Sequence, residues 1–221
     1  MGADFSGQDL TDSNFQDYKL SNSKFVEANL TNANFAFAIL TGSNFANSTL
    51  TNATFYGANL EAVKMSNLDM SSLDLRYANL ASARLNRTNL RLSLFNCACL
   101  DSADLSFANL SGAFFGAEEG DAASLVDANL EGADLSGADL GGTNLSRARF
   151  VDACLVGTDL RGANLQDANL TGADLTRALL DGNLTGANLT RANLSGAVFG
   201  EMNLELVTFC ETTMPDGSIR P

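Results

Sequence analysis

Acidic side chains are the residues of this sequence that are most able to take part in catalysis or ligand binding. The chain holds 26 Asp and Glu against 13 Lys and Arg, which gives a net charge of −13. It contains no His, so a Ser or Cys nucleophile would lack its usual imidazole base. Carboxylates could act as general acids or bases in a closed pocket, or as ligands for a cation. The densest acidic run is Glu118, Glu119 and Asp121, which surround Gly120.

The cysteines and the overall charge narrow the range of ligands. The chain has four Cys, which match no zinc-binding spacing: Cys97, Cys99, Cys154 and Cys210. We therefore expect free thiols in a reducing compartment, with no metal and no cofactor. An acidic surface repels nucleic acid and anionic membranes. The expected partner is a protein or a cation, with no direct binding to nucleic acid.

A five-residue repeat positions all of these side chains. From residue 5 to residue 180, every fifth residue is Leu, Phe or Met at 35 of 36 positions, and the exception is Gly120. Two residues before each of these centres, the side chain is Ala, Ser, Thr or Gly at 30 of the 36 positions. The unit therefore reads small, polar, Leu or Phe, polar, polar, as in residues 128–132.

The period of five excludes both common regular elements. On a helix, residues five apart lie about 140° apart around the axis, and on a strand an odd spacing sends them to opposite faces. The backbone must therefore turn once per repeat. From Phe5 to Leu60, Phe and Leu alternate as centres, which forms consistent columns in a four-sided coil but not in a three-sided one. We predict an all-β, four-sided solenoid.

The repeats resemble those of the pentapeptide-repeat proteins, whose signature is A-[D/N]-L-x-x. The resemblance covers nearly the whole chain, and it implies a right-handed quadrilateral β-helix. Residues 214–218, Met-Pro-Asp-Gly-Ser, are similar to endings that are common in bacterial members of the family, notably cyanobacterial ones. About 42 repeats would make about 10.5 coils and a rod roughly 50 Å long at ~4.8 Å per coil.

One domain is predicted over residues 1–214, followed by a tail over 215–221. Glu118 falls at an inward position, where an unpaired carboxylate is costly, so the backbone should bulge outward over 117–122. Near 181–184 the frame slips, because four residues stand where five are expected.

The start of the chain bears on partners and location. The repeat is already in frame at Ala3, so an open first coil could pair end to end with another chain. Met1 to Leu10 has no secretory signal, and no apolar run reaches the ~20 residues of a membrane helix. We expect no membrane insertion and a cytoplasmic location, or the periplasm or thylakoid lumen if a targeting segment was removed.

In a regular four-sided coil, residues 20 apart stack in one column. The fourth side would then carry an acidic ladder just before its centres, with Glu118 and Asp121 close by: Cys99, Glu119, Asp139 and Asp159. Carboxylates stacked ~4.8 Å apart repel one another unless they are solvated or bridged by a cation. The ladder is therefore either a solvated acidic face or a site for a partner or a cation.

The third side carries an apolar anomaly. Leu94 and Phe114 stand just before its centres, where Asn or Asp is usual, and Tyr77 lies on a nearby corner. We expect these side chains to project outward as an apolar patch. The patch could support self-association or the binding of a partner, although single surface hydrophobes are also common.

These observations favour a non-catalytic structural or interaction module that presents a rod-like acidic surface to a protein partner. A filled rod offers no deep pocket for an enzyme. The alternative is a DNA mimic that binds DNA gyrase or topoisomerase, as the fluoroquinolone-resistance type of the family does. Residues 111–221 hold 16 acidic and 6 basic residues, net −10. Duplex DNA half as long as the rod would carry about 14 charges, so any mimicry would be partial.

Overall fold

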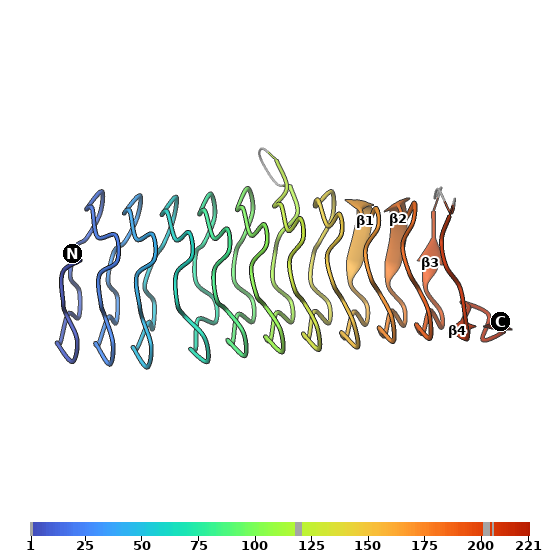
Figure 1. Cartoon of the computed structure of the whole chain (residues 1–221), viewed down its shortest axis with the longest axis horizontal. Helices are drawn as coiled ribbons and strands as arrows, with labels where there is room; N and C mark the ends of the chain where they lie inside the picture. The colour runs from blue at the N-terminus through green and yellow to red at the C-terminus, as the bar shows by residue number, and fades with distance from the viewer. Residues whose placement is uncertain (1, 118–120, 201–203, 205) are drawn as a thin grey trace.

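The chain forms a four-sided rod, seen in a computed structural model that describes residues 2–117, 121–200, 204 and 206–221. The coils stack in a row from the N-terminus to the C-terminus (Figure 1). Parallel bridges join each side to the same side of the next coil, as from Asp4 to Lys24 and from Lys24 to Asn44. The predicted fold, an all-β right-handed quadrilateral β-helix, is confirmed.

Each corner is a tight turn that begins at a centre. The N–H of Ala28, for example, donates to the carbonyl of Phe25 at 3.1 Å, and Glu27 between them has a φ of 59°. Positive φ at the third position of a turn is the requirement of a type II turn, which Gly and Asn meet at the lowest cost. Asn, Asp and Gly accordingly occupy many of these corner positions, and no β-branched residue does so among the described residues.

The core is a filled stack of the centres and of the small residues two positions earlier. In the first coils Phe25 lies parallel to Phe45 with ring centroids 4.7 Å apart, and its ring meets Phe35 edge-on at 5.4 Å. Further along, Leu replaces most of the Phe, and both centres and inward Ala residues remain fully buried. Because each coil between Phe15 and Leu194 buries large side chains at its centres, burial is spread evenly along this part of the rod.

A five-residue insertion interrupts the rod in its middle. Paired residues are 20 apart in the first coils, as for Asn29 and Asp9, but Asn129 pairs with Asp104, which is 25 residues away. The insertion lies in one corner, because the N–H of Ala123 donates to the Phe115 carbonyl at 2.9 Å and so closes that turn. Residues 118–120, including Glu118 and Glu119, lie outside the described residues.

The second irregularity is a coil that is one residue short. Strand β1 (Asp159–Asn164) pairs in parallel with β2 (Leu179–Asn183), and their register shifts between Arg161 and Asn164. Asn164 and Asn183 are consequently 19 residues apart when their side chains meet at 3.0 Å. The two-residue strand β3 (Val198–Phe199) continues this sheet beyond β2.

The C-terminal residues fold back on the last coil. Strand β4 (Thr212–Thr213) pairs antiparallel with β5 (Ile219–Arg220), and the guanidinium of Arg220 lies 4.2 Å from the ring centroid of Phe209. Residues 215–221, expected to be a tail, thus include the second strand of a hairpin. Among the described residues, no helix has the length and apolarity needed to cross a membrane.

Candidate protein-interaction surface

One side of the rod gathers most of the residues singled out by their type. We call it the third side, because its first centre, Phe15, is the third in the chain. The residues just before its centres form one continuous column of ten, each bridged to the next: Asn14, Asn34, Thr54, Asp74, Leu94, Phe114, Asp139, Asp159, Leu179 and Val198. The predicted apolar patch and the predicted acidic ladder therefore lie on the same side.

The prediction of an acidic ladder on the fourth side was wrong. Cys99 pairs with Ser124, so neither Asp139 nor Asp159 shares its column. The five inserted residues move every later residue round by one side, which brings Asp139 into register with Phe114 instead. Of the nearby acidic residues, Asp121 lies on the insertion, where its carbonyl accepts the Cys97 thiol at 2.8 Å.

The two aspartates that follow the insertion in this column differ in their partners. Asp159 binds Arg161 in a bidentate ion pair, with Nε donating to Oδ1 at 2.9 Å and Nη2 donating to Oδ2. The hydrogen bond from this guanidinium lowers the pKa of Asp159 below its ordinary value. Asp139 accepts the backbone N–H of Gly141 at 2.9 Å. Arg161 also interacts electrostatically with Asp139 and Asp181, so the surface around Asp139 and Asp159 is acidic but contains a cation.

The apolar residues lie where the sequence predicted them, in the middle of the third side. Phe114 is 40% exposed and Leu94 is partly buried beside it. Leu92, on the corner that precedes this side, is also exposed and packs over Gly112. Together they form a partly exposed apolar patch two coils long.

An aromatic ridge extends this patch along the third corner, which is the turn after each third-side centre. Phe37 meets Tyr56 edge-on at 5.4 Å, and Tyr56 meets Tyr77 at 5.3 Å. The guanidinium of Arg76 lies 5.5 Å from the centroid of Tyr56 and also pairs with Asp74. Phe37 and Tyr77 remain about half exposed, at 51% and 48%.

Sequence reasoning found Tyr77 but missed Phe37 and Tyr56. The signal was available, since sorting the first two residues after every third-side centre would have placed the three aromatics on one corner. A hydrogen bond to Cys97 raises the pKa of the Tyr77 phenol, so this side chain is also tied to the next coil.

Two residues of the ridge and the neighbouring Leu92 are bulky side chains at corner positions with positive φ. Phe37, Tyr77 and Leu92 have φ between 57° and 60°, a region that costs a residue with a Cβ about 1–2 kcal/mol. Glycine or Asn stands at many equivalent corners, so these bulky residues occupy positions that folding alone would fill differently. Phe107, on a different corner, shares the exposure and has a φ of 58°, so the assignment of this surface rests on the contacts among the rings rather than on their backbone conformation.

Beyond the apolar patch, the same corner is hollow. Gly141, Gly142 and Gly162 replace the aromatic residues there, and a depression of about 390 Å³ opens between Gly116, Asp139 and Arg161. A second depression of about 250 Å³ lies further along, between Arg161, Leu179 and Val198. The third corner thus consists of a ridge toward the N-terminus and hollows toward the C-terminus.

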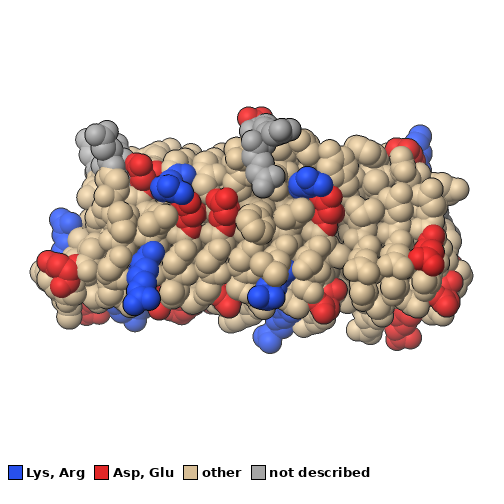
Figure 2. Space-filling view, turned by 180° about the vertical axis from the view of Figure 1, so that it is seen from behind, with Lys and Arg blue, Asp and Glu red and all other residues tan. Residues whose placement is uncertain are grey.

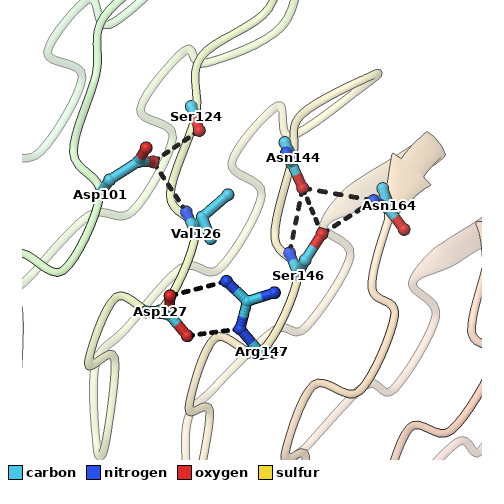
Figure 3. A network of polar contacts seen from close by, with 8 residues as sticks. All are labelled: Asp101, Ser124, Val126, Asp127, Asn144, Ser146, Arg147 and Asn164. Atoms are coloured by element: carbon cyan, nitrogen blue, oxygen red, sulfur yellow. Dashed lines mark hydrogen bonds and ion pairs between the residues drawn. The ribbon is translucent and has the colours of Figure 1, made fainter.

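Elsewhere on the surface, many polar side chains pair with one another. Figure 3 shows Asn164 donating to Asn144 and Ser146 on the fourth side, and Arg147 clasping Asp127 on the following corner. On the side seen in Figure 2, basic and acidic groups often lie next to one another, with large uncharged areas between them. Among the described residues, no three of His, Cys, Asp and Glu are placed to hold a metal ion together.

The repeat geometry and the sequence define one family. The pentapeptide repeat model matches eight stretches of the chain, the first over residues 2–26 and the last over 181–209. The chain belongs to the pentapeptide repeat family. Among curated proteins, the comparison finds none that matches.

Solved structures give the nearest points of reference. The chain is 30% identical to HetL, a pentapeptide repeat protein involved in heterocyst differentiation regulation in the cyanobacterium Nostoc sp. strain PCC 7120. The match covers 99% of this chain and 92% of HetL, with a TM-score of 0.60. It is 18% identical to the plasmid-mediated fluoroquinolone resistance protein QnrB1, covering 91% of both chains with a TM-score of 0.38. A pentapeptide repeat protein from the thylakoid lumen of Arabidopsis thaliana is 24% identical over 60% of this chain and 68% of its own, with a TM-score of 0.19.

Proposed function

We propose that the chain is a non-catalytic interaction module that binds a protein partner through its third side. The observation that carries the proposal is the exposed ridge of Phe37, Tyr56 and Tyr77, continuous with Leu94 and Phe114. Aromatic residues and Arg dominate the binding energy of protein interfaces, and Arg76 lies within this ridge. The acidic stretch at Asp139 and Asp159 borders the same surface and would select a partner by charge.

The structure offers little support for catalysis. The interior is filled by buried Leu, Phe and Ala, and the two depressions on the third side are shallow and open to solvent. A carboxylate on an open, solvated surface is a poor general acid at neutral pH, because burial or a neighbouring negative charge is needed to raise a carboxyl pKa toward neutrality. Asp159 illustrates this, since its ion pair moves the pKa in the opposite direction.

The test is an affinity capture with matched baits. The double variant Tyr77→Asn, Phe114→Asn should fold normally, because Asn is the usual residue at both kinds of position. The control is Phe107→Asn, which removes a ring that is 54% exposed with a φ of 58° on a different corner. We expect proteins bound by the wild type to be lost from the double variant and kept by the control. Equal capture by all three baits would refute the assignment of this surface.

The alternative of DNA mimicry has a direct assay. Several carboxylates of the acidic half are paired with arginines, as Asp127 is with Arg147 and Glu131 with Arg149. These pairs reduce the density of free negative charge that a gyrase would meet. We expect no change in the supercoiling activity of gyrase at micromolar protein, and inhibition or protection there would favour the mimic. A cytoplasmic location is part of the proposal, and it could be checked by cell fractionation.

A further inference from the structure

The ladder of parallel bridges is broken at one place, between the third coil, residues 41–60, and the fourth coil, residues 61–80. On the second side, which precedes the third side in every coil, bridges run from Asp9 to Thr49 and resume at Asp69, but Thr49 and Asp69 are not bridged. Among the described residues, every other pair of neighbouring coils is bridged on this side. Figure 1 shows these two coils, where blue turns to teal, farther apart along the lower edge of the rod than their neighbours are.

Backbone groups along the break have lost their partners. In a regular coil the N–H of a centre donates to the next coil, as Leu30 does to the Thr49 carbonyl at 2.8 Å. Among the described residues there is no corresponding bond from the N–H of Leu50, Asn52 or Asp69. A depression of about 250 Å³ lies there instead, and these three residues line it together with nearby hydroxyl groups. Unpaired backbone groups are costly away from water, so solvent is expected to enter the break.

An oversized side chain at an inward position accounts for the break. Inward positions usually hold Ala, Ser, Thr or Gly, but the fourth coil has Val63, Leu68 and Leu73 there. Leu68 is the one on the second side, and its neighbour in the third coil, Ser48, is 9% exposed, against 1% for Ala28 one coil earlier. Because a close-packed core absorbs extra methylene groups only through shifts of the backbone, Leu68 acts as a wedge between the two coils.

The opposite side of the same junction is closed. On the fourth side the N–H of Leu60 donates to the Asn79 carbonyl at 2.7 Å, and the N–H of Asn79 donates to the Ala58 carbonyl at 2.9 Å. The first and third sides also keep their bridges between these two coils. The junction is therefore open along one side and joined along the opposite one, which is the geometry of a hinge.

We propose that this junction is a hinge, at which the rod bends as the wall of the second side opens and closes while the fourth side stays joined. The inference goes beyond the proposed function and does not depend on it. Each coil of a solenoid contacts only its neighbours, so one weak junction divides the rod into two arms that keep their own packing. Local opening is easiest where backbone hydrogen bonds are few and reached by solvent, as they are here.

The hinge would act on the aromatic ridge. Tyr56 belongs to the third coil and Tyr77 to the fourth, and their ring centroids lie 5.3 Å apart across the junction. The guanidinium of Arg76, in the fourth coil, lies 5.5 Å from the centroid of Tyr56. Bending at the junction changes the angle between the two rings, so a partner that held both rings would also fix the bend of the rod.

The first test is amide hydrogen exchange in the whole chain, followed by NMR spectroscopy. The amides of Leu50 and Asn52 should exchange at least about 100-fold faster than those of Met70 and Ser72. Met70 and Ser72 hold the same positions one coil later, and each N–H donates to the fifth coil at 2.8 Å. Equal protection of the two pairs of amides in the wild type would overturn the inference, whatever the variants show.

The variant Leu68→Ala tests the cause of the break. Ala is the usual inward residue, so we expect the wall to close and the exchange of Leu50 and Asn52 to slow at least about tenfold. The matched control is Val63→Ala, the same kind of change in the same coil on the first side, where the bridge is intact. The control should leave both amides fast. Slowing in both variants, or in neither, would contradict the role of Leu68 as the wedge.

Residual dipolar couplings from the same samples distinguish a hinge from a fixed gap. In a weakly aligned solution a rigid rod has a single alignment tensor, which fits the couplings of every coil. We expect the first three coils of the wild type to show a smaller tensor than the fourth and fifth coils, and the two to agree in Leu68→Ala. A single tensor for the wild type would refute the hinge. The affinity captures with the Tyr77→Asn, Phe114→Asn bait do not depend on this result, so the proposed function would stand.

Discussion

At the scale of the residue, the position of a side chain within the five-residue unit decides whether it raises or lowers the free energy of unfolding. Ala58 and Ala62 make the contrast clear, because both are alanines of neighbouring repeats. Ala58 points inward and is fully buried, whereas Ala62 sits at a corner with a φ of 54°. The same substitution should therefore have opposite effects at the two places.

We predict that Ala62→Gly stabilises the protein by about 1 kcal/mol, because glycine adopts positive φ without a Cβ clash. Ala58→Gly should destabilise it by about 1 kcal/mol, because it removes a buried methyl group and loosens the unfolded chain. Urea unfolding followed by circular dichroism measures both. Shifts of the same sign in the two variants would contradict this view of the corner.

A second pair of residues tests which aromatics belong to the core. Phe35→Ala should destabilise the rod by about 3–5 kcal/mol, since Phe35 is fully buried and stacks on Phe15 and Phe55 at 4.9 and 5.1 Å. Phe37→Asn should change stability by no more than about 0.5 kcal/mol, because its ring is half exposed and Asn tolerates the backbone conformation. A large loss from Phe37→Asn would place that ring in the core rather than in an interface.

At the scale of the element, the sequence predicts each regular coil but not the insertion that reorders them. An insertion of five residues leaves the five-residue period unbroken, so the period does not reveal it. Every later residue nevertheless moves to the next side of the coil. Gly120 as a centre and Glu118 at an inward position were its local signs, and they predicted a bulge over 117–122 without predicting that the later coils are shifted. The slip near Leu184 was predictable, since one missing residue breaks the frame.

This undetected shift affected the prediction of the candidate surface most. Leu94, Phe114 and Tyr77 were placed correctly because they precede the insertion, whereas Asp139 and Asp159 were assigned to the wrong side because they follow it. Glu118 and Gly120 mark an irregular repeat, but a bulged repeat that keeps its place in the coil and a five-residue corner loop would both show these two residues. The hydrogen bond from Ala123 to Phe115 and the 25-residue spacing of the bridges across this region decide between them.

Removing the insertion should therefore leave a regular rod. Deleting residues 117–121 with Ala122→Gly makes Gly116 and position 122 an ordinary corner, with glycine where positive φ is required. We expect an unchanged or higher melting temperature, because the corner loop is shorter and the stacked centres are kept. Thermal unfolding by circular dichroism measures this. A loss of cooperative unfolding would mean that the insertion stabilises the coils next to it.

At the scale of the whole molecule, hydrogen-bonded aspartates link stability to pH along the length of the rod. Asp9, Asp69 and Asp159 have pKa values below the ordinary 3.8, mainly because a side chain two residues later donates a hydrogen bond to the carboxylate. The pKa values of four further aspartates are also lowered: Asp4, Asp74, Asp127 and Asp216. A carboxyl group whose pKa is lower in the folded state contributes stability above its unfolded pKa, and that contribution is lost as the pH falls through the folded value.

The composition of the chain allows the effect of these hydrogen bonds on stability to be separated from the effect of repulsion between like charges. With 26 acidic and 13 basic residues and no His, the net charge is −13 at pH 7 and becomes +13 when every carboxyl group is protonated. Net repulsion is thus equal in size at the two extremes. We expect the urea midpoint to hold between pH 7 and about pH 5 and to fall steadily below about pH 4, which unfolding series at pH 7, 5, 4, 3 and 2 would show. Asp9→Asn should reduce the fall, because it removes one of the linked groups, and equal midpoints at pH 7 and pH 2 would mean that these hydrogen bonds contribute nothing.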